Sequence, residues 1–396
     1  MAIKRIEIQN FKSFRHQAIE LGQFNVLIGA NASGKSNFLQ IFKFISDIAH
    51  HGLNNAISRQ GGVEYLRNTN IAAQENLVLK IVIDSNYSDD GLIDPEATNI
   101  PEITYEFALK FNPQGLGFEI VMDKFTYKPP NEPGELSITQ TNGCVSTENT
   151  LGDLMQAFCQ DSLLSKSLKL QTLLLEQPVF REIFAELNQV DIFNLMLIYD
   201  FDAKQSKGTS SEIDQLDLEE DTGNLAIVLK NILANQEEKR HFFNLLTYVL
   251  PFVEDVRVEP VAEKCLIITL RETYSQTYLP VAFVSEGTIN AISLVIALYY
   301  EKPLMLIEEP NKNLYPYLIE GILELFREVS ENKQIIVTTQ SSQVVKCAGL
   351  DNLFFISRDK DGFSTISKQA VENKDVKIFL QNLDVEFLYT QDLLGV

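Results

Sequence analysis

The segment Gly29-Ala-Asn-Ala-Ser-Gly-Lys35-Ser36 has the residue types and spacing of a loop that binds phosphate groups. It follows the expected strand 23–28 and precedes residues 36–49, whose apolar side chains recur at helical spacing. Glycines let successive main-chain N–H groups turn toward a phosphate at the positive end of the following helix. Lys35 adds a positive charge, and the Ser36 hydroxyl is a ligand for Mg²⁺. The pattern predicts an ATP site with Mg²⁺; a glycine turn that only joins two elements is the alternative.

Several side chains and N–H groups of this loop and of the helix start can reach the nucleotide. The residues expected to contact it are Asn31, Ser33, Gly34, Lys35, Ser36 and Asn37.

A second candidate segment, Pro303-Leu-Met-Leu-Ile-Glu308-Glu309-Pro310, is an apolar run that ends in two carboxylates. A buried parallel strand that ends in acids places them at the carboxyl edge of the sheet, beside the phosphate loop. We expect Glu308 to share the metal ion with Ser36, and Glu309 to polarise the water that attacks the terminal phosphate. An apolar strand that ends in two acids is common by itself, so this assignment depends on the phosphate loop.

The elements that must position these residues follow from periodicity and turn signals. In the first part of the chain we expect a first helix at 36–49, strands at 3–9, 17–21 and 23–28, and then a β-rich lobe with strands at 76–84, 102–111, 115–128 and 134–139. Residues 148–200 have a helical pattern, and 203–221 is a polar linker whose acidic run, 212–221, faces solvent. Then come helices over 223–248, and strands at 253–260, 265–272 and 278–284.

From residue 287 onward, helical and strand patterns alternate, which is typical of a parallel sheet flanked by helices. The expected order is helix 287–300, strand 303–307, helix 316–330, strand 334–339, helix 341–347 and strand 352–357.

Composition limits the partners. The chain has 396 residues, with 33 Lys and Arg against 54 Asp and Glu and a net charge of −21. This charge disfavours tight binding of nucleic acid by the chain alone, although a local basic groove is still allowed. No stretch approaches the roughly 20 apolar residues of a membrane span, and the N-terminus has no secretion signal. We therefore expect a cytoplasmic protein that does not enter a membrane.

Four ordered motifs resemble one family. Asn10-Phe-Lys-Ser-Phe14 before the phosphate loop, Val284-Ser-Glu-Gly-Thr288, Leu306-Ile-Glu-Glu-Pro310 and Thr338-Thr339 look like the motifs of RecF/SMC-like ABC-type ATPases. More narrowly, the chain is similar to the bacterial "predicted ATPase" group of AAA type, whose relatives include overcoming-lysogenization-defect (OLD) proteins and anti-phage Septu-type ATPases. The resemblance covers about 1–70 and 220–396.

The resemblance implies the α/β fold of an ABC-type P-loop ATPase head. Residues 1–140 would form its N-terminal part with the phosphate loop and β-lobe, and 221–396 its C-terminal part. Residues 141–220 would be a mostly helical insertion with an acidic linker, where SMC relatives carry a long coiled coil. Because the insertion has no sustained heptad pattern, we expect it to be compact.

The resemblance also assigns residues to a dimer. Ser285 and Gly287 match the ABC signature, which in relatives contacts the γ-phosphate bound by the other subunit. A serine hydroxyl, a glycine N–H and a helix start can indeed bind an anion, but the same residues could simply cap the helix. Residues 311–316 occupy the D-loop position, which in relatives crosses the dimer interface. Gln60 is either the metal- and water-sensing glutamine or an ordinary loop amide.

The sequence departs from the family pattern at three places. Relatives usually have histidine where Gln340 follows Thr338-Thr339. A glutamine can hydrogen-bond the γ-phosphate or a water, but it cannot carry a positive charge or shuttle a proton. Asn313 and Tyr315 replace the usual Gly and His of the D-loop, and Ala32 replaces a usual Gly in the phosphate loop. We expect ATP binding to survive these changes. Gln340 would be the catalytic sensor, and ATP hydrolysis would be slow.

The sequence therefore predicts a Mg-dependent ATP-binding protein and ATPase whose ATP-driven homodimerisation controls a partner protein or a nucleic-acid transaction. Anti-phage defence and DNA repair are the pathways that the resemblance suggests. The alternative is an ATP-gated switch or scaffold with little hydrolysis that recruits an effector. The hypothesis that the chain is a kinase or GTPase is weaker, because neither function explains the segment at Ser285. The sequence has no recognisable nuclease, so a nuclease-type effector would be a separate polypeptide.

Overall fold

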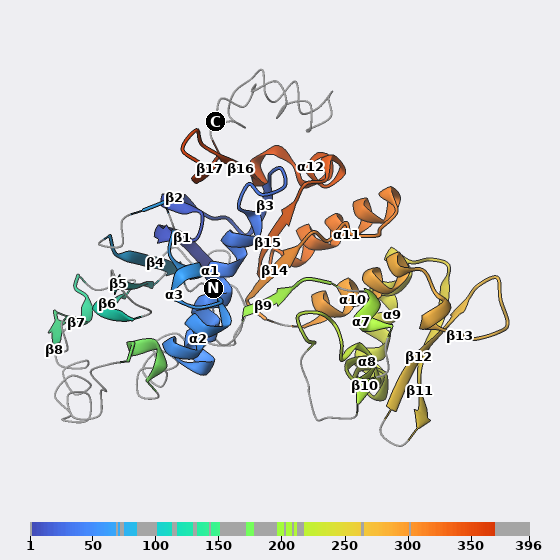
Figure 1. The fold of residues 1–396 in the computed structure, drawn as a ribbon. Helices are drawn as coiled ribbons and strands as arrows, with labels where there is room; N and C mark the ends of the chain where they lie inside the picture. Colours follow the sequence, from blue (N-terminus) through green and yellow to red (C-terminus); the bar gives the residue numbers. More distant parts are fainter. Residues whose placement is uncertain are drawn as a thin grey trace.

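Three β-sheets, with helices beside them, make up the described part of the chain (Figure 1). The computed structural model describes residues 2–68, 70–71, 75–84, 101–112, 117–129, 133–141, 144–150, 172–177, 196–201, 203–207, 210–211, 218–262, 265–300 and 302–368. No helix in these ranges is both long and apolar enough to cross a membrane. The expected α/β class is confirmed.

The central sheet has six strands in the order β17-β16-β3-β15-β14-β9. Its five parallel strands are β3 (Phe24–Ile28), β9 (Met196–Tyr199), β14 (Leu304–Glu308), β15 (Gln334–Thr339) and β16 (Leu353–Arg358), and β17 (Ser364–Ser367) is an antiparallel edge. Successive side chains on a strand point to opposite faces, so Leu304 and Leu306 enter one core, and Met305 and Ile307 enter another. This explains the continuous apolar runs, which suit a strand buried on both faces.

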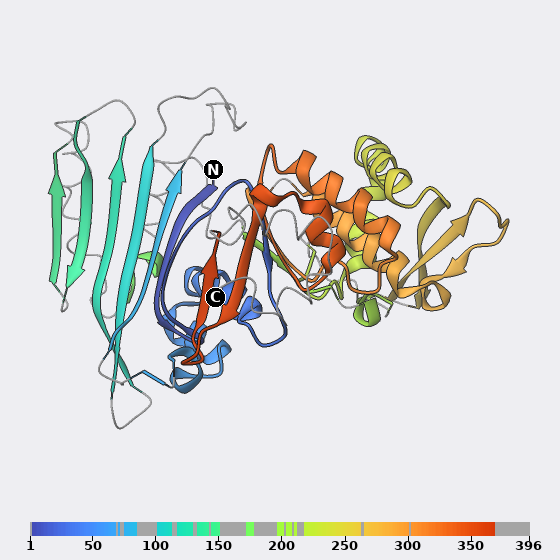
Figure 2. The same cartoon turned by 90° about the horizontal axis from the view of Figure 1, so that it is seen from above.

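The first core lies between the central sheet and a seven-stranded antiparallel sheet (Figure 2). The phosphate-loop helix α1 (Lys35–His51) belongs to it, with Phe38, Phe42 and Ile45 fully buried. The short helices α2 (Leu53–Arg59) and α3 (Val63–Leu66) follow. In chain order the sheet strands are β1 (Ala2–Phe11), β2 (Phe14–Glu20), β4 (Leu77–Asp84), β5 (Glu102–Phe111), β6 (Phe118–Lys128), β7 (Leu136–Thr141) and β8 (Cys144–Asn149).

The second core lies on the other face of the central sheet, under helices and a small antiparallel sheet (Figures 1 and 2). Helix α10 (Glu286–Tyr299) is buried from Gly287 to Leu298, because other helices pack around it. The other helices are α7 (Ala203–Ser206), α8 (Leu225–Ala234), α9 (Gln236–Val249), α11 (Pro316–Val329) and α12 (Ser342–Ala348). The small sheet contains β10 (Ser210–Ser211), β11 (Val253–Ala262), β12 (Cys265–Glu272) and β13 (Leu279–Pro280).

The structure corrects several sequence-based expectations. Cys144–Asn149, within the expected mostly helical insertion 141–220, form strand β8, because β7 supplies an antiparallel partner. Met196–Tyr199, at the end of the segment with a helical pattern, form strand β9, because β14 supplies a parallel partner for this apolar run. The expected strand 278–284 is limited to Leu279–Pro280, and the 3₁₀ turn η2 (Val281–Phe283) follows it. The rest of the expected helical insertion, 151–171 and 178–195, and most of the acidic run, 212–217, lie outside the described residues.

A buried carboxyl holds one described piece of the insertion against the β-lobe. Asp123 on β6 is 0 % exposed, and its Oδ2 accepts a 2.5 Å hydrogen bond from the N–H of Leu174. Leu174 begins the 3₁₀ turn η1 (Leu174–Glu176) and is itself buried in the first core. Burial raises the pKa of Asp123 to about 7, although the Leu174 N–H and the Tyr105 hydroxyl favour the ionised form. The carboxyl is therefore protonated in the folded chain at mildly acidic pH.

Asp123→Asn should remove part of the pH dependence of stability. Because the pKa of Asp123 is higher in the folded chain than in the unfolded one, its contribution to stability is complete below about pH 4 and is lost as pH rises to about 7. At pH 8 the variant should be more stable than the wild type, by at most roughly 4 kcal/mol, and the difference should shrink steadily as pH falls toward about 4. Thermal unfolding from pH 5 to 8 measures this, with Glu254→Gln as an exposed control. Parallel profiles for the wild type and Asp123→Asn would contradict the prediction.

Candidate functional site

A cavity of about 270 Å³ opens at the carboxyl edge of the central sheet. Strands β3, β14 and β15 end there at the same level, because Glu308 is in register with Thr338, and Thr339 with Ile28. The lining residues are Asn31, Ala32, Gly34, Lys35, Ser36, Asn37, Glu308, Glu309, Lys312, Gln340 and Arg358. Thus the phosphate loop, the acidic strand end and Gln340 share one cavity, although Ser36 of the loop and Glu308 are 272 residues apart in the chain.

The phosphate loop curls around the Lys35 ammonium. Lys35 Nζ donates to the carbonyl oxygens of Gly29 at 2.7 Å and Ala30 at 3.0 Å. Burial lowers the pKa of Lys35, while the carboxylates of Glu309 and Glu308 oppose this shift. The two carbonyls keep the ammonium in place at the cavity wall, and a phosphate oxygen can take over as its partner.

Ser36 and Glu308 lie side by side where the sequence predicts the metal ion. Ser36 Oγ donates to Glu308 Oε1 at 2.5 Å. A hydroxyl and a carboxylate are oxygen ligands of the kind that Mg²⁺ prefers, and Mg²⁺ usually takes only one or two such protein ligands, with water and phosphate oxygens as the others. The donor set therefore fits the expected ion.

Glu309 is the more constrained of the two acids. Its φ is +47°, a left-handed conformation that is unusual outside glycine, and its side chain is buried. Oε2 accepts 3.2 Å hydrogen bonds from the Thr339 hydroxyl and from the Gln340 N–H. Burial raises the pKa of Glu309, while the Gln340 N–H and the Lys35 charge oppose the shift. A carboxylate with a raised pKa is a better acceptor of a proton from water.

The hairpin β16–β17 supports the phosphate loop from behind, which the sequence analysis missed. Arg358 donates from Nε to the carbonyl of Ala32 at 2.9 Å, and Ser364 donates from Oγ to that of Ser33 at 2.6 Å. Gly34 has φ +117°, and a Cβ there would lie 2.2 Å from the Ser364 oxygen. Only the basic Arg358 at a strand end could have signalled this role.

Ser285 and Gly287 lie outside this cavity. Ser285 Oγ accepts from the Thr288 N–H at 3.1 Å, so it caps helix α10 while the residue stays exposed. Gly287 is buried beneath the D-loop, where a Cβ would lie 2.2 Å from the carbonyl oxygen of Asn313. Within one chain both residues therefore have a structural function, and Ser285 still faces solvent.

Two other expected residues are also away from the cavity. Ser33 is buried, and it contributes its carbonyl to the Ser364 contact. Gln60 ends helix α2, is buried and is not among the lining residues. This placement favours the ordinary amide over the metal- and water-sensing one.

A family model described as "AAA domain, putative AbiEii toxin, Type IV TA system" matches residues 24–346, which include the phosphate loop, the acidic strand end and Gln340. The chain belongs to this AAA family. No curated protein matches this AAA-domain chain.

Solved structures give the fold of this family member. It is similar to an SMC head bound to the C-winged helix domain of ScpA, at 17 % identity over 93 % of this chain and 98 % of that chain, with a TM-score of 0.51. The SMC head domain from Thermotoga maritima is also similar, at 17 % identity over 93 % of this chain and 98 % of that chain, with a TM-score of 0.47. The match to the first of these structures confirms the expected SMC-type head fold, and the family model confirms the expected AAA group.

Gly287→Ala should destabilise the chain by about 1–3 kcal/mol, because the new methyl group collides with main-chain atoms of the D-loop. Urea unfolding measures the change, and Ser285→Ala is the matched control, with an expected loss of about 1 kcal/mol from the helix cap alone. Equal stability of Gly287→Ala and the wild type would show that the D-loop is free to move away from α10.

Proposed function

We propose that this AAA-family protein binds Mg-ATP in the cavity and hydrolyses it slowly. The observation that carries the proposal is the 2.5 Å contact between Ser36 and Glu308, beside Lys35 and Glu309 in the same cavity. Lys35 would neutralise the β- and γ-phosphates, and loop N–H groups would bind the remaining phosphate oxygens. When bound, Mg²⁺ would supply charge neutralisation at the phosphates, with Ser36 and Glu308 as its protein ligands.

Glu309 would act as the base that orients the attacking water. Its buried carboxylate is fixed by Thr339 and Gln340, so it enters the reaction already oriented. Gln340 would sense the γ-phosphate with an exposed amide that lines the cavity. Because an amide cannot carry a proton, Gln340 supports slow rather than fast turnover.

ATP would also join two copies of the chain. Ser285 is exposed at the start of α10, and with the nearby N–H groups it could bind the γ-phosphate held by a second copy. Such a contact is isologous, so one dimer would contain two shared sites. Hydrolysis at Glu309 would then separate the heads.

The dimer would control a separate partner, for which we propose an effector protein of nuclease type in anti-phage defence or DNA repair. A protein partner has a parallel in the similar SMC head, which binds a domain of ScpA. The net charge of −21 makes nucleic acid the less favoured partner.

An ATP-gated switch with little hydrolysis is the second candidate, and Gln340 favours it. In that case bound ATP would hold the dimer and recruit the effector without turnover. The steady-state rate of phosphate release distinguishes the two functions. For an ATPase the wild type releases phosphate and Glu309→Gln does not, whereas for a switch both proteins release almost none.

Lys35→Ala should abolish ATP binding, because its charge and the adjacent loop form the main phosphate anchor. Isothermal calorimetry with Mg-ATP measures this, with Lys128→Ala on the outer face of the β-lobe as a control that removes the same charge. Wild-type affinity in Lys35→Ala would exclude this cavity as the ATP site.

Glu309→Gln should keep ATP bound and accumulate a dimer, because the base is lost while the shape of the side chain is kept. Adding Ser285→Arg should prevent that dimer by a clash with the facing phosphate, while each head still binds ATP. Light scattering after chromatography, with and without Mg-ATP, measures both variants. A monomeric Glu309→Gln protein at saturating Mg-ATP, or a dimer that tolerates Ser285→Arg, would exclude the shared-site dimer.

A further inference from the structure

Lys312 is a cation of the cavity to which the motifs give no role. It lies three residues after Glu309, and its N–H donates to the Glu309 carbonyl at 3.0 Å. Its own carbonyl accepts from Asn290 Nδ2 on α10 at 2.9 Å, so both sides of its main chain are fixed. The side chain lines the cavity, 42 % exposed, and its charge opposes the raised pKa of Glu309. Lys312 is therefore held beside the base, near the expected position of the terminal phosphate.

In this structure the Lys312 ammonium forms an ion pair with Asp200. Asp200 directly follows β9, which pairs with β14 in parallel, so it reaches the same sheet edge as Glu308. Asp200 is not among the lining residues, and its side chain is 51 % exposed. The ion pair with Asp200 therefore directs the Lys312 ammonium toward the rim of the cavity.

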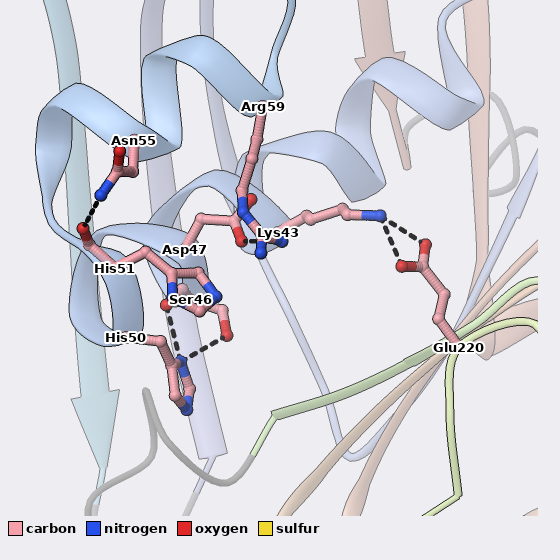
Figure 3. Close-up of polar contacts among 8 residues, drawn as sticks. All are labelled: Lys43, Ser46, Asp47, His50, His51, Asn55, Arg59 and Glu220. Carbon is pink, nitrogen blue, oxygen red and sulfur yellow. Dashed lines mark hydrogen bonds and ion pairs between the residues drawn. The ribbon is translucent and has the colours of Figure 1, made fainter. Parts of the chain in front are cut away.

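Asp200 is itself anchored to the phosphate-loop helix. Its N–H donates to the carbonyl of Glu220 at 3.1 Å. Lys43 on α1 donates to both carboxylate oxygens of Glu220. One turn further along α1, Asp47 forms an ion pair with Arg59 (Figure 3). These contacts fix the main chain at Asp200, so its carboxylate stays within reach of Lys312.

The ion pair is easily exchanged for a phosphate contact. Exposed pairs of this kind contribute about 0–1 kcal/mol, whereas a phosphate offers several charged acceptors in a partly closed cavity. Lys35 and Arg358 already donate to loop carbonyls, at 2.7 Å from Lys35 to Gly29 and 2.9 Å from Arg358 to Ala32. Of these three cations, Lys312 is the one whose described partner is a solvent-exposed carboxylate.

We propose that Lys312 is a second phosphate-binding cation, specific for the terminal phosphate, and that Asp200 competes with that phosphate for its ammonium. The proposal rests on the proposed ATP site. It makes Asp200 a regulator of ATP affinity that never touches the nucleotide.

The first test separates ATP from ADP. Lys312→Ala should weaken Mg-ATP binding roughly tenfold, since a charge-assisted contact is lost, and should change Mg-ADP binding less than twofold. A merely structural role would weaken both nucleotides alike. Calorimetry at constant ionic strength measures both, with Lys128→Ala as the matched loss of a lysine. Equal losses for ATP and ADP, or none for ATP, would overturn the proposal.

The second test asks whether Asp200 acts through Lys312. Asp200→Asn should tighten Mg-ATP binding several-fold, and in a Lys312→Ala background the same change should have no effect. Glu254→Gln, which breaks an exposed pair with Arg271, is the control for loss of a carboxylate. Unchanged or weaker ATP binding in Asp200→Asn, or the same gain without Lys312, would overturn the competition. If the wild type binds no ATP, the proposed ATP-binding function fails together with this proposal. If the wild type binds ATP and the Lys312 and Asp200 variants bind it equally well, the proposed function stands and the role of Lys312 and Asp200 is excluded.

Discussion

The parallel register of β3, β15 and β14 is the constraint on which the site depends. Hydrogen bonding places Ile28 beside Thr339 and Thr338 beside Glu308, so three chain segments end at one level. Strand pairing therefore brings the phosphate loop, the paired acids and Gln340 to one edge, where Ser36 contacts Glu308 and the Gln340 N–H contacts Glu309. A slip of one residue would turn Glu308 to the opposite face of the sheet and separate it from Ser36. Gln334 secures the start of β15, because its buried side-chain amide bonds both Ile3 and Gly22.

The sequence was informative where a local rule decides the structure. The phosphate loop, the apolar run to Glu308 and the later helix–strand alternation all have local signals, and the structure has these elements. The sequence-based prediction was wrong at β9. This apolar stretch is a strand because it pairs with β14, and a pattern within the stretch cannot indicate a partner that is distant in the chain. The same holds for Ser364 and Arg358, whose contacts to the loop join residues more than 300 positions apart. Ser285 is different, because its function and not its conformation is ambiguous. A helix cap and an anion site use the same hydroxyl and N–H groups, so the sequence alone does not distinguish them.

Left-handed backbone occurs at two residues that line the cavity and in the turn after Glu309, as it also does at Asn10, Lys12 and Thr222. Ala32, Glu309 and Asn313 have φ of +62°, +47° and +60°, in a region that non-glycine residues seldom adopt. Such residues cost of order 1–3 kcal/mol each and persist where the surroundings enforce them. For Glu309 the enforcing contacts are the Thr338 carbonyl on its N–H and the two hydrogen bonds to its carboxylate. For Ala32 the strain explains why glycine is usual at that position in the family that the chain resembles.

The turn after Glu309 connects the parts that would have to move together. Asn311 Oδ1 lies 2.7 Å from the Thr339 hydroxyl, whose one proton it shares with Glu309. Lys312 reaches the cavity, and Asn313 donates to Glu286 at 3.0 Å. The Asn313 carbonyl also covers Gly287, which leaves no room for a methyl group between the turn and α10. The main chain of Lys312 is hydrogen-bonded to the Glu309 carbonyl on one side and to Asn290 of α10 on the other. Because packed elements shift as units rather than deform, this turn and the start of α10 form one unit.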